Sequence, residues 1–325
     1  MARRLIIDTA NLLFRVNAMN AKQSFGSDEE RAGLALHTSF QVMHKYFRKF
    51  KPDQIIFSFE GTNNWRKTYT MGEWGEPITP NVYKANRVKD KSIEPFLELI
   101  GAFHEVMRDH TTAVCMHVDC CEGDDVIAGA TRRLTAEGDE VIIVSADKDF
   151  VQLLKYPGVR LIDPATGKDR ECEDLDYWIF EKCVRGDAGD NVHSAFPRVR
   201  KTKIVEAFQD DFKRQNMMEE TWTGKMGPDG EEPKTYRVGD MFVENKLLMD
   251  LECQPDHVKA EIEKGLDEAF NNPGQYNNFK FMRFLGQFGL NAIGESIHLY
   301  TDMLSAKISD EITAQRQATS DLLEF

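Results

Sequence analysis

The sequence predicts an α/β fold with a mostly parallel central sheet, followed by a smaller helical region. Three observations support this prediction. Four short apolar segments have the composition of buried strands, amphipathic stretches with helical spacing separate them, and each strand ends at or just before an acidic residue. Strands that alternate with helices are typical of parallel sheets covered by helices on both faces.

The predicted strands are rich in β-branched and apolar residues. In chain order they are RLIID (4–8), QIIFSFE (54–60), AVCMHVD (113–119) and EVIIVSAD (140–147). Between the last two, the apolar residues of DDVIAGATRRLTAEG recur at helical spacing, and Gly138 follows as a helix-ending glycine. From about Arg185 onward the strand signals fade and charged helical sequence takes over. We therefore expect one domain at residues 1–185 and a second, helical one at 186–325.

Two further segments interrupt this pattern. Residues 66–91 are polar, contain two glycines and end in VYKANRVKDK, so we expect a long connection that could move. Residues 221–240, TWTGKMGPDGEEPKTYRVGD, hold a GPDG turn between Thr, Trp and Tyr residues, and this arrangement predicts a β-hairpin insertion.

Composition narrows the class of protein. The 325 residues are 41% hydrophobic and 29% charged, which is ordinary for a folded protein. No apolar run approaches the roughly 18 residues of a membrane span, and the first apolar run is too short for a signal peptide. The six cysteines form no CxxC pair and the histidines show no ligand spacing, so a structural zinc site is not expected. We expect a cytoplasmic, monomeric protein without a membrane partner.

Acidic residues follow every predicted strand, and two more occur in the GDAGDNV segment at 186–192. The carboxyl ends of parallel strands meet at one edge of a sheet, so these side chains should converge. Such a cluster repels itself unless cations bind there, and hard carboxylate oxygens favour Mg²⁺ or Mn²⁺. The candidate metal ligands are Asp8, Glu60, Glu122, Asp124, Asp125, Asp147, Asp149, Asp187 and Asp190. For any one of them alone, a helix cap or a surface position explains the residue equally well.

The net charge of −13 argues against a nucleic-acid partner unless the acids are concentrated at a metal site. Two basic stretches favour such a partner, because cations beside an aromatic residue suit phosphate contact and base stacking. Either stretch alone is equally consistent with a solvated helix face. The candidate nucleic-acid contacts are Arg66, Lys67, Tyr83, Lys84, Arg87, Lys89 and Lys91 in the first region and Arg198, Arg200, Lys201 and Lys203 in the second.

The order of motifs over roughly residues 1–210 resembles the 5′-nuclease family, which includes flap endonucleases and the 5′-nuclease domain of bacterial DNA polymerase I. The motifs are IDTANLLFR, FEGTNNWRK, VYKANR, CEGDDVIAG, VSADKDFVQLL and RGDAGDNV. With ADKDFVQLLKYPGV and VENKLLMDLE, the chain is most similar to the T-even phage ribonuclease H branch of that family. The resemblance implies a PIN-like nuclease domain followed by a helical DNA-binding domain, acting in the cytoplasm of a bacterial host.

The resemblance also implies a reaction. It is two-metal hydrolysis of phosphodiesters at 5′ ends, flaps and forks of DNA and RNA–DNA hybrids, with two Mg²⁺ ions for which Mn²⁺ substitutes. The nine acids match the family's metal-binding positions, although Asp125 could instead cap a helix. Lys84 and Arg87 match the basic residues of the arch that contacts the scissile phosphate, and Tyr83 lies where the family often has an aromatic residue.

Two departures from the family pattern qualify these implications. The family usually has Asp where this chain has Glu60, so Glu60 is expected to reach a metal through water. The glycine-rich turn that often carries K⁺ is replaced by VHSAFPRVRKTKIVEA, which makes a K⁺ site doubtful and shifts duplex binding onto Arg198, Arg200, Lys201 and Lys203. The last residues, SDLLEF, could dock into a sliding clamp or contact a single-strand-binding protein, or pack on their own domain.

Two other classes of protein stay open on the residues alone. A phosphatase of the haloacid dehalogenase type also has Asp at the end of its first strand, but it needs a second Asp two residues later, where this chain has Ala10. A non-catalytic module that binds DNA structures or a clamp would carry degenerate acids, whereas this set is intact.

Overall fold

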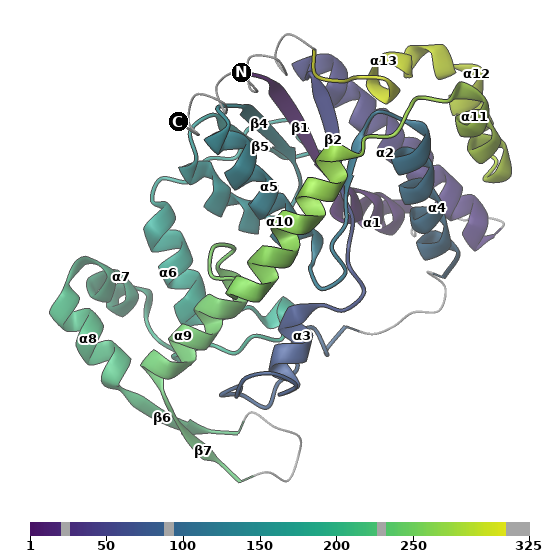
Figure 1. The fold of residues 1–325 in the computed structure, drawn as a ribbon. Coiled ribbons are helices and arrows are strands. Elements are labelled where there is room, and N and C mark those ends of the chain that lie inside the picture. The colour runs from purple at the N-terminus through teal and green to yellow at the C-terminus, as the bar shows by residue number, and fades with distance from the viewer. Residues whose placement is uncertain (21–26, 88–93, 226–231, 310–325) are drawn as a thin grey trace.

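The protein is built around a five-stranded parallel sheet with the strand order β3-β2-β1-β4-β5 (Figure 1). The computed structural model describes residues 1–20, 27–87, 94–225 and 232–309. The strands are β1 Arg3–Asp8, β2 Gln54–Ser58, β3 Val114–Met116, β4 Glu140–Val144 and β5 Val159–Ile162. This arrangement confirms the predicted α/β class with its parallel sheet.

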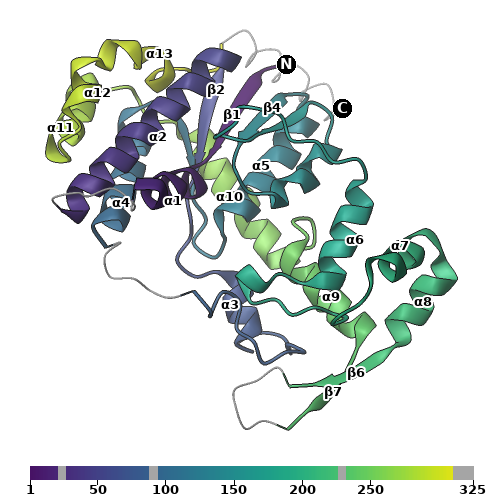
Figure 2. The same ribbon diagram turned by 180° about the vertical axis from the view of Figure 1, so that it is seen from behind.

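Helices cover both faces of the sheet, because alternate residues of each strand point to opposite sides. Leu5 and Ile7 of β1 pack with α1 Thr9–Asn20, α2 Asp28–Phe50 and α4 Glu94–His110. Ile6 packs on the other face with α5 Gly123–Ala136 and α10 Asp256–Asn271. Figures 1 and 2 show these two layers from opposite sides.

All four strands expected from the sequence are present, and β5 is a fifth that was not predicted. β5 has only four residues, VRLI, and pairs with β4 at the edge of the sheet. The apolar run is short and Arg160 interrupts it, so it gives no strand signal of its own. The helix expected before β4 is α5, and Gly138 follows it with a left-handed φ of 81°.

A lobe beyond the sheet contains the elements between residues 175 and 249 (Figure 2). Its helices are α6 Leu175–Arg185, α7 Lys201–Gln209, α8 Asp211–Glu219 and α9 Val238–Met249. Phe180, Val184, Ile204 and Met217 form a small apolar core between α6, α7 and α8. β6 Thr221–Gly224 and β7 Lys234–Arg237 pair as an antiparallel ribbon inside the segment expected to hold a hairpin.

The last helices differ from the expected domain division, because they return to the sheet instead of joining this lobe. Val258, Ile262 and Leu266 of α10 are fully buried in the core that contains α5 and β3. The remaining elements, which pack on the α2–α4 side, are α11 Asn278–Gln287, α12 Asn291–Glu295, η4 Ile297–Leu299 and α13 Thr301–Leu304. The helical region that stands apart from the sheet is therefore 175–249, not 186–325. Helical periodicity indicates a buried face but not which core it joins.

The described part of the 66–91 connection is anchored. It begins with α3 Trp65–Thr70, and Trp74 packs edge-on against His257 with ring centroids 4.9 Å apart. The buried Glu244 of α9 accepts a 2.6 Å hydrogen bond from the backbone N–H of Ile78. Residues 88–91 of this connection lie outside the described residues. None of the described helices is long and apolar enough to span a membrane.

Candidate active site

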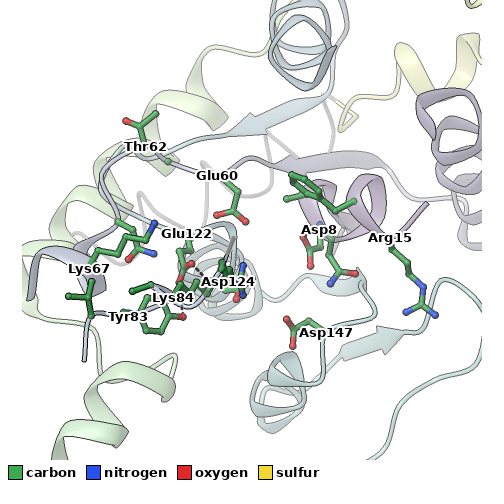
Figure 3. Close-up of a pocket in the computed structure, with 18 residues that line it drawn as sticks. Asp8, Arg15, Glu60, Thr62, Lys67, Tyr83, Lys84, Glu122, Asp124 and Asp147 are labelled. Atoms are coloured by element: carbon green, nitrogen blue, oxygen red, sulfur yellow. Dashed lines mark hydrogen bonds and ion pairs between the residues drawn. The ribbon is translucent and has the colours of Figure 1, made fainter. Parts of the chain in front are cut away.

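Five carboxylates meet at the carboxyl edge of the sheet. Asp8 is the last residue of β1, Glu60 follows β2, Glu122 and Asp124 lie at the start of α5, and Asp147 follows β4. They line one cleft of about 950 Å³ and point toward its centre (Figure 3). The predicted convergence is present because β1, β2 and β4 run parallel and side by side.

The second and third strand ends are held together by an unusually close backbone contact. The N–H of Gly61 donates a 2.9 Å hydrogen bond to the carbonyl of Cys121. A Cβ at Gly61 would lie 2.3 Å from the carbonyl oxygen of Val118, so only glycine fits there. As a result Glu60 reaches the start of α5, where its carboxylate accepts a 3.0 Å hydrogen bond from the N–H of Gly123.

Four of these carboxylates, Asp8, Glu60, Asp124 and Asp147, form no ion pair among the described residues. Burial raises the pKa of Asp8 to about 7, although Ser145 Oγ donates a 2.6 Å hydrogen bond to it. Burial and the neighbouring Asp8 and Asp147 carboxylates raise the pKa of Asp124 well above its ordinary value. Desolvation and Glu122 raise the pKa of Glu60. The ionised forms of these carboxyl groups are therefore disfavoured without a bound cation, and no cationic side chain of the described residues pairs with them directly.

This donor set fits a hard divalent cation. Its oxygens are carboxylate oxygens, and the cost of burying them together falls when a cation is bound. Within the described ranges, no three acidic, histidine or cysteine side chains already stand close enough to enclose a metal ion. The cleft is an open row of ligands and not a closed cage.

Asp125 does not belong to this row, and its prediction as a metal ligand is corrected. Its carboxylate is fully buried and faces away from the cleft, where it forms a bidentate pair with the guanidinium of Arg66 at 2.6 Å and 2.8 Å. The indole N–H of Trp65 and the amide of Gln254 also donate to it. The Arg66 pair and these hydrogen bonds outweigh the effect of burial and lower the pKa of Asp125.

Arg66 and Tyr83 are likewise corrected as nucleic-acid contacts, because both side chains are buried. Arg66 is 2% exposed and also donates a 2.7 Å hydrogen bond to the carbonyl of Leu248. Tyr83 is 4% exposed, and its hydroxyl lies 3.0 Å from a carboxylate oxygen of Glu122 and 2.9 Å from one of Asp190. Their role here is to hold α3 and the 82–87 segment against the acids.

Lys84 and Arg87 lie at the rim of the cleft and contact the acids that flank it. The ammonium of Lys84 contacts Glu122 and lies 3.8 Å from Asp190, and Arg87 pairs with Asp190 at 2.7 Å. Lys84 has a left-handed φ of 56°, and its N–H donates to the carbonyl of Asp190. The 82–87 segment is thereby fastened to the 187–191 turn.

Asp149 and Asp187 form a second pair of acids beside a second cavity of about 400 Å³. Both contact the ammonium of Lys182, which reaches them from α6. The N–H of Asp149, the first residue of the short 3₁₀ helix η2 Asp149–Lys155, donates to the carboxylate of Asp147, which therefore holds the start of this helix as well as lining the cleft. Of the nine acids predicted as metal ligands, four have no cationic partner among the described residues. The other five pair with Arg66, Lys84, Arg87 or Lys182.

The remaining predicted nucleic-acid contacts are distributed over two regions. Lys67 is exposed at the wall of the main cleft. Arg198, Arg200 and Lys201 are exposed before and at the start of α7, whereas Lys203 pairs with Glu220 at 2.5 Å. Lys89 and Lys91 lie outside the described residues.

Three residues at the site were not predicted from the sequence: Asn11, Arg15 and Lys182. Asn11 and Arg15 line both cavities together with Asp147. Figure 3 shows Arg15 and Lys67 on opposite sides of the acids. Arg15 follows Asn11 by four residues within α1, so the two lie on one face of the helix that begins directly after Asp8, and helical spacing was an available signal. No local pattern marks Lys182.

Residues 3–182 match the model of the 5′-3′ exonuclease N-terminal resolvase-like domain, which is more than half of the chain. The chain belongs to the 5′-3′ exonuclease family. It is 27% identical to ribonuclease H of Enterobacteria phage T4 over 201 residues, which cover 55% of this chain and 61% of that protein. It is 28% identical to flap endonuclease Xni of Shewanella loihica over 203 residues, covering 59% of this chain and 70% of that one.

The fold also matches a solved structure of this family. The bacteriophage T5 D15 flap endonuclease, in a complex with DNA and metal ions, aligns with a TM-score of 0.57 and 16% identity over 82% of this chain and 99% of that one. This likeness agrees with the parallel sheet and the helical region that follows it. The curated T4 relative is longer than the matched part, since the chain spans less than two thirds of its length.

Proposed function

We propose that this chain is a divalent-cation-dependent 5′ nuclease, a 5′→3′ exonuclease and flap endonuclease with ribonuclease H activity. Its substrates would be 5′ flaps and the RNA primers of replicating DNA. One observation carries the proposal: four carboxylates without a cationic partner lie in a cleft flanked by the exposed cations Lys67 and Arg15. The relatives named ribonuclease H and flap endonuclease support the substrate class.

Mg²⁺ is the cation that fits this oxygen-only donor set, and Mn²⁺ has the same preference. Asp8, Glu60, Asp124 and Asp147 would hold it, and Asp149 and Asp187 would supply ligands for a second ion. When bound, such ions activate water and stabilise the developing charge on the phosphate oxygens. The metal ions in the T5 complex support divalent-cation dependence.

The chain's own residues would bind and orient the substrate. Lys67 and Arg15 would contact phosphates on either side of the cleavage position, since both are exposed on the walls of the cleft. Lys84 and Arg87 would exchange Glu122 and Asp190 for the scissile phosphate when the substrate enters the cleft. Arg198, Arg200 and Lys201 would contact the duplex beyond the cleft, as cations that need no base contact.

The first test is cleavage of a 5′-labelled RNA–DNA hybrid and of a 5′-flap DNA, with Mg²⁺ and with EDTA. We expect short 5′ products only with Mg²⁺. Asp147→Asn should abolish cleavage without abolishing DNA binding, because it removes a metal ligand and no basic residue. Asp267→Asn on α10 is the matched control, since Asp267 pairs with Arg133 and does not line the cleft.

Tight binding of the flap without Mg²⁺-dependent cleavage would instead favour the non-catalytic structure-binding module. A phosphatase of the haloacid dehalogenase type would need a second aspartate where this chain has Ala10, and only a covalent phosphate on Asp8 would support that alternative.

Docking of SDLLEF to a sliding clamp is part of the proposal, although that segment lies outside the described residues. Deleting Leu322–Phe325 should spare cleavage and remove stimulation by a clamp, and equal stimulation of the truncated protein would refute it.

A further inference from the structure

Lys182 holds a position at the site that no motif assigned to it. It lies near the end of α6, and its side chain is 11% exposed. Its ammonium contacts Asp149 and lies 3.5 Å from Asp187. It also lies 5.4 Å from the ring centroid of Trp178, so three groups hold this cation in place.

The two acids that Lys182 joins are each anchored by a local hydrogen bond, Asp187 through its carboxylate and Asp149 through its backbone. The carboxylate of Asp187 accepts a 2.8 Å hydrogen bond from the N–H of Gly189, which sets its direction in the 187–191 turn. Asp149 begins η2, and its N–H donates to Asp147. The turn thus orients the Asp187 carboxylate, while the Asp149 carboxylate is held by Lys182 itself.

The pair can be reached from two sides. Lys182 approaches from α6, whereas the 400 Å³ cavity opens onto Asp149 and Asp187 from the side of Asn11, Arg15 and Asp147. A cation that arrives through this cavity would meet two carboxylates whose charge one ammonium already offsets in part. The four acids of the main cleft have no such resident cation among the described residues.

We propose that Lys182 competes with a divalent cation for Asp149 and Asp187, and thereby sets the affinity of this end of the cleft for a second ion. The inference rests on the proposed function in one respect, the expectation of a second ion. Lys182 acts as a positioning residue, since it touches the acids and not the substrate. If the ammonium leaves the pair only one tenth of the time, the apparent affinity for the second ion falls about tenfold.

The experiment is a calorimetric titration of the metal-free full chain with Mn²⁺, without nucleic acid. We expect two classes of site, a stronger one at the main cleft and a weaker one at Asp149 and Asp187. Lys182→Met should strengthen the weaker class by about tenfold and leave the stronger class unchanged. Lys182→Arg, which keeps a cation at this position, should leave the weaker class weak.

Lys148→Met is the matched control. Lys148 is exposed and lines the same cavity. Its replacement by Met removes one positive charge, as Lys182→Met does, but leaves Lys182 in contact with Asp149 and Asp187. If Lys148→Met strengthens Mn²⁺ binding at the weaker class of site as much as Lys182→Met does, the effect is one of general charge and the proposal is overturned. An unchanged or weakened second class in Lys182→Met would overturn it as well.

A measurement on the unmodified chain decides the question if Lys182→Met fails to fold. Mg²⁺ should displace the ammonium, so acetylation of Lys182 by acetic anhydride, followed by peptide mass spectrometry, should increase with Mg²⁺ while that of Lys148 does not. If Lys182 is acetylated no faster at saturating Mg²⁺ than without Mg²⁺, the proposed competition is refuted. The calorimetric and acetylation experiments use no nucleic acid, so their outcomes do not depend on the cleavage assay. The proposed nuclease function and the proposed role of Lys182 can therefore fail independently.

Discussion

Arg66 and Asp125 form a buried bidentate ion pair, with Nη1–Oδ2 and Nη2–Oδ1 distances of 2.6 Å and 2.8 Å. The pair joins α3 to the first turn of α5, and Arg66 extends it to the carbonyl at Leu248 near the end of α9. Asp124, which faces the cleft, is the neighbour of Asp125 in the chain. The ion pair therefore fixes the turn of α5 that presents an acid to the cleft.

Replacing Arg66 by Met should lower the free energy of unfolding by about 3–5 kcal/mol, because it leaves the buried Asp125 carboxylate without its cation. Urea unfolding of both proteins measures the difference. In the double variant Arg66→Met/Asp125→Leu most of this loss should be recovered, since no charge stays buried. A double variant as unstable as the single one would contradict the ion-pair explanation.

The control for this prediction is Arg133→Met. Arg133 pairs with Asp267 at 2.6 Å, but the Asp267 side chain is 59% exposed. Water screens such a pair, so the loss should stay below about 1 kcal/mol.

The Asp8 carboxyl should make the metal-free protein less stable as the pH rises from about 4 to about 7. The pKa of Asp8 in the folded chain is about 7 against an ordinary value of 3.8, so the unfolded chain ionises first and is favoured in this interval. Asp8→Asn removes the effect and should flatten the dependence of Tm on pH in EDTA. Equal slopes for the two proteins would show that Asp8 is ionised freely in the folded state.

His104 should contribute the opposite slope over most of the same pH interval, so each contribution is measured against its own variant. Burial, together with the neighbouring His117, lowers its pKa to about 4 from an ordinary 6.5. The unfolded chain then takes up the proton first, and stability is lost as the pH falls from about 6.5 to about 4. His104→Phe keeps the stacking on Phe59, whose ring centroid lies 4.2 Å away, and should reduce this loss. His298→Gln, at an exposed position, should not.

Arg200 and Lys201 should contribute to nucleic-acid affinity through phosphate contact alone. Each replacement by Gln should reduce the slope of log K against log salt by about 0.9 on duplex DNA, with no change in sequence preference. Binding titrations at several salt concentrations measure the slope. Lys264→Gln on α10, which lies outside both predicted basic stretches, should leave it unchanged, and an equal loss there would indicate a diffuse charge effect.

The sequence was sufficient to predict the edge of the sheet where these carboxylates converge. An acid at or just after the end of a parallel strand lies at the carboxyl edge, which was enough to place Asp8, Glu60 and Asp147, whereas Glu122 and Asp124 also depend on where α5 begins. Chain direction and strand parallelism were the only further requirements for the first three.

Which acids face the cleft and which pair with a buried cation was not predictable in the same way. Asp124 and Asp125 are adjacent and chemically alike, and only the position of Arg66, 59 residues away, decides that Asp125 faces the interior. Lys182 reaches Asp149 across 33 residues in the same manner. Such pairings depend on tertiary packing, which a periodicity argument does not contain. The packing of α10–α13 on the sheet was missed for the same reason.

The return of these last helices to the sheet has a consequence for synthesis on the ribosome. The layer formed by α10 closes one face of the core, and Met303 and Leu304 of α13 are buried against the other. The strands and acids of the first half are translated well before the residues that cover them. At 5–20 residues per second this interval lasts on the order of ten seconds, during which apolar strand surface stays uncovered. The nascent sheet is therefore a natural client for a chaperone until its C-terminal helices emerge.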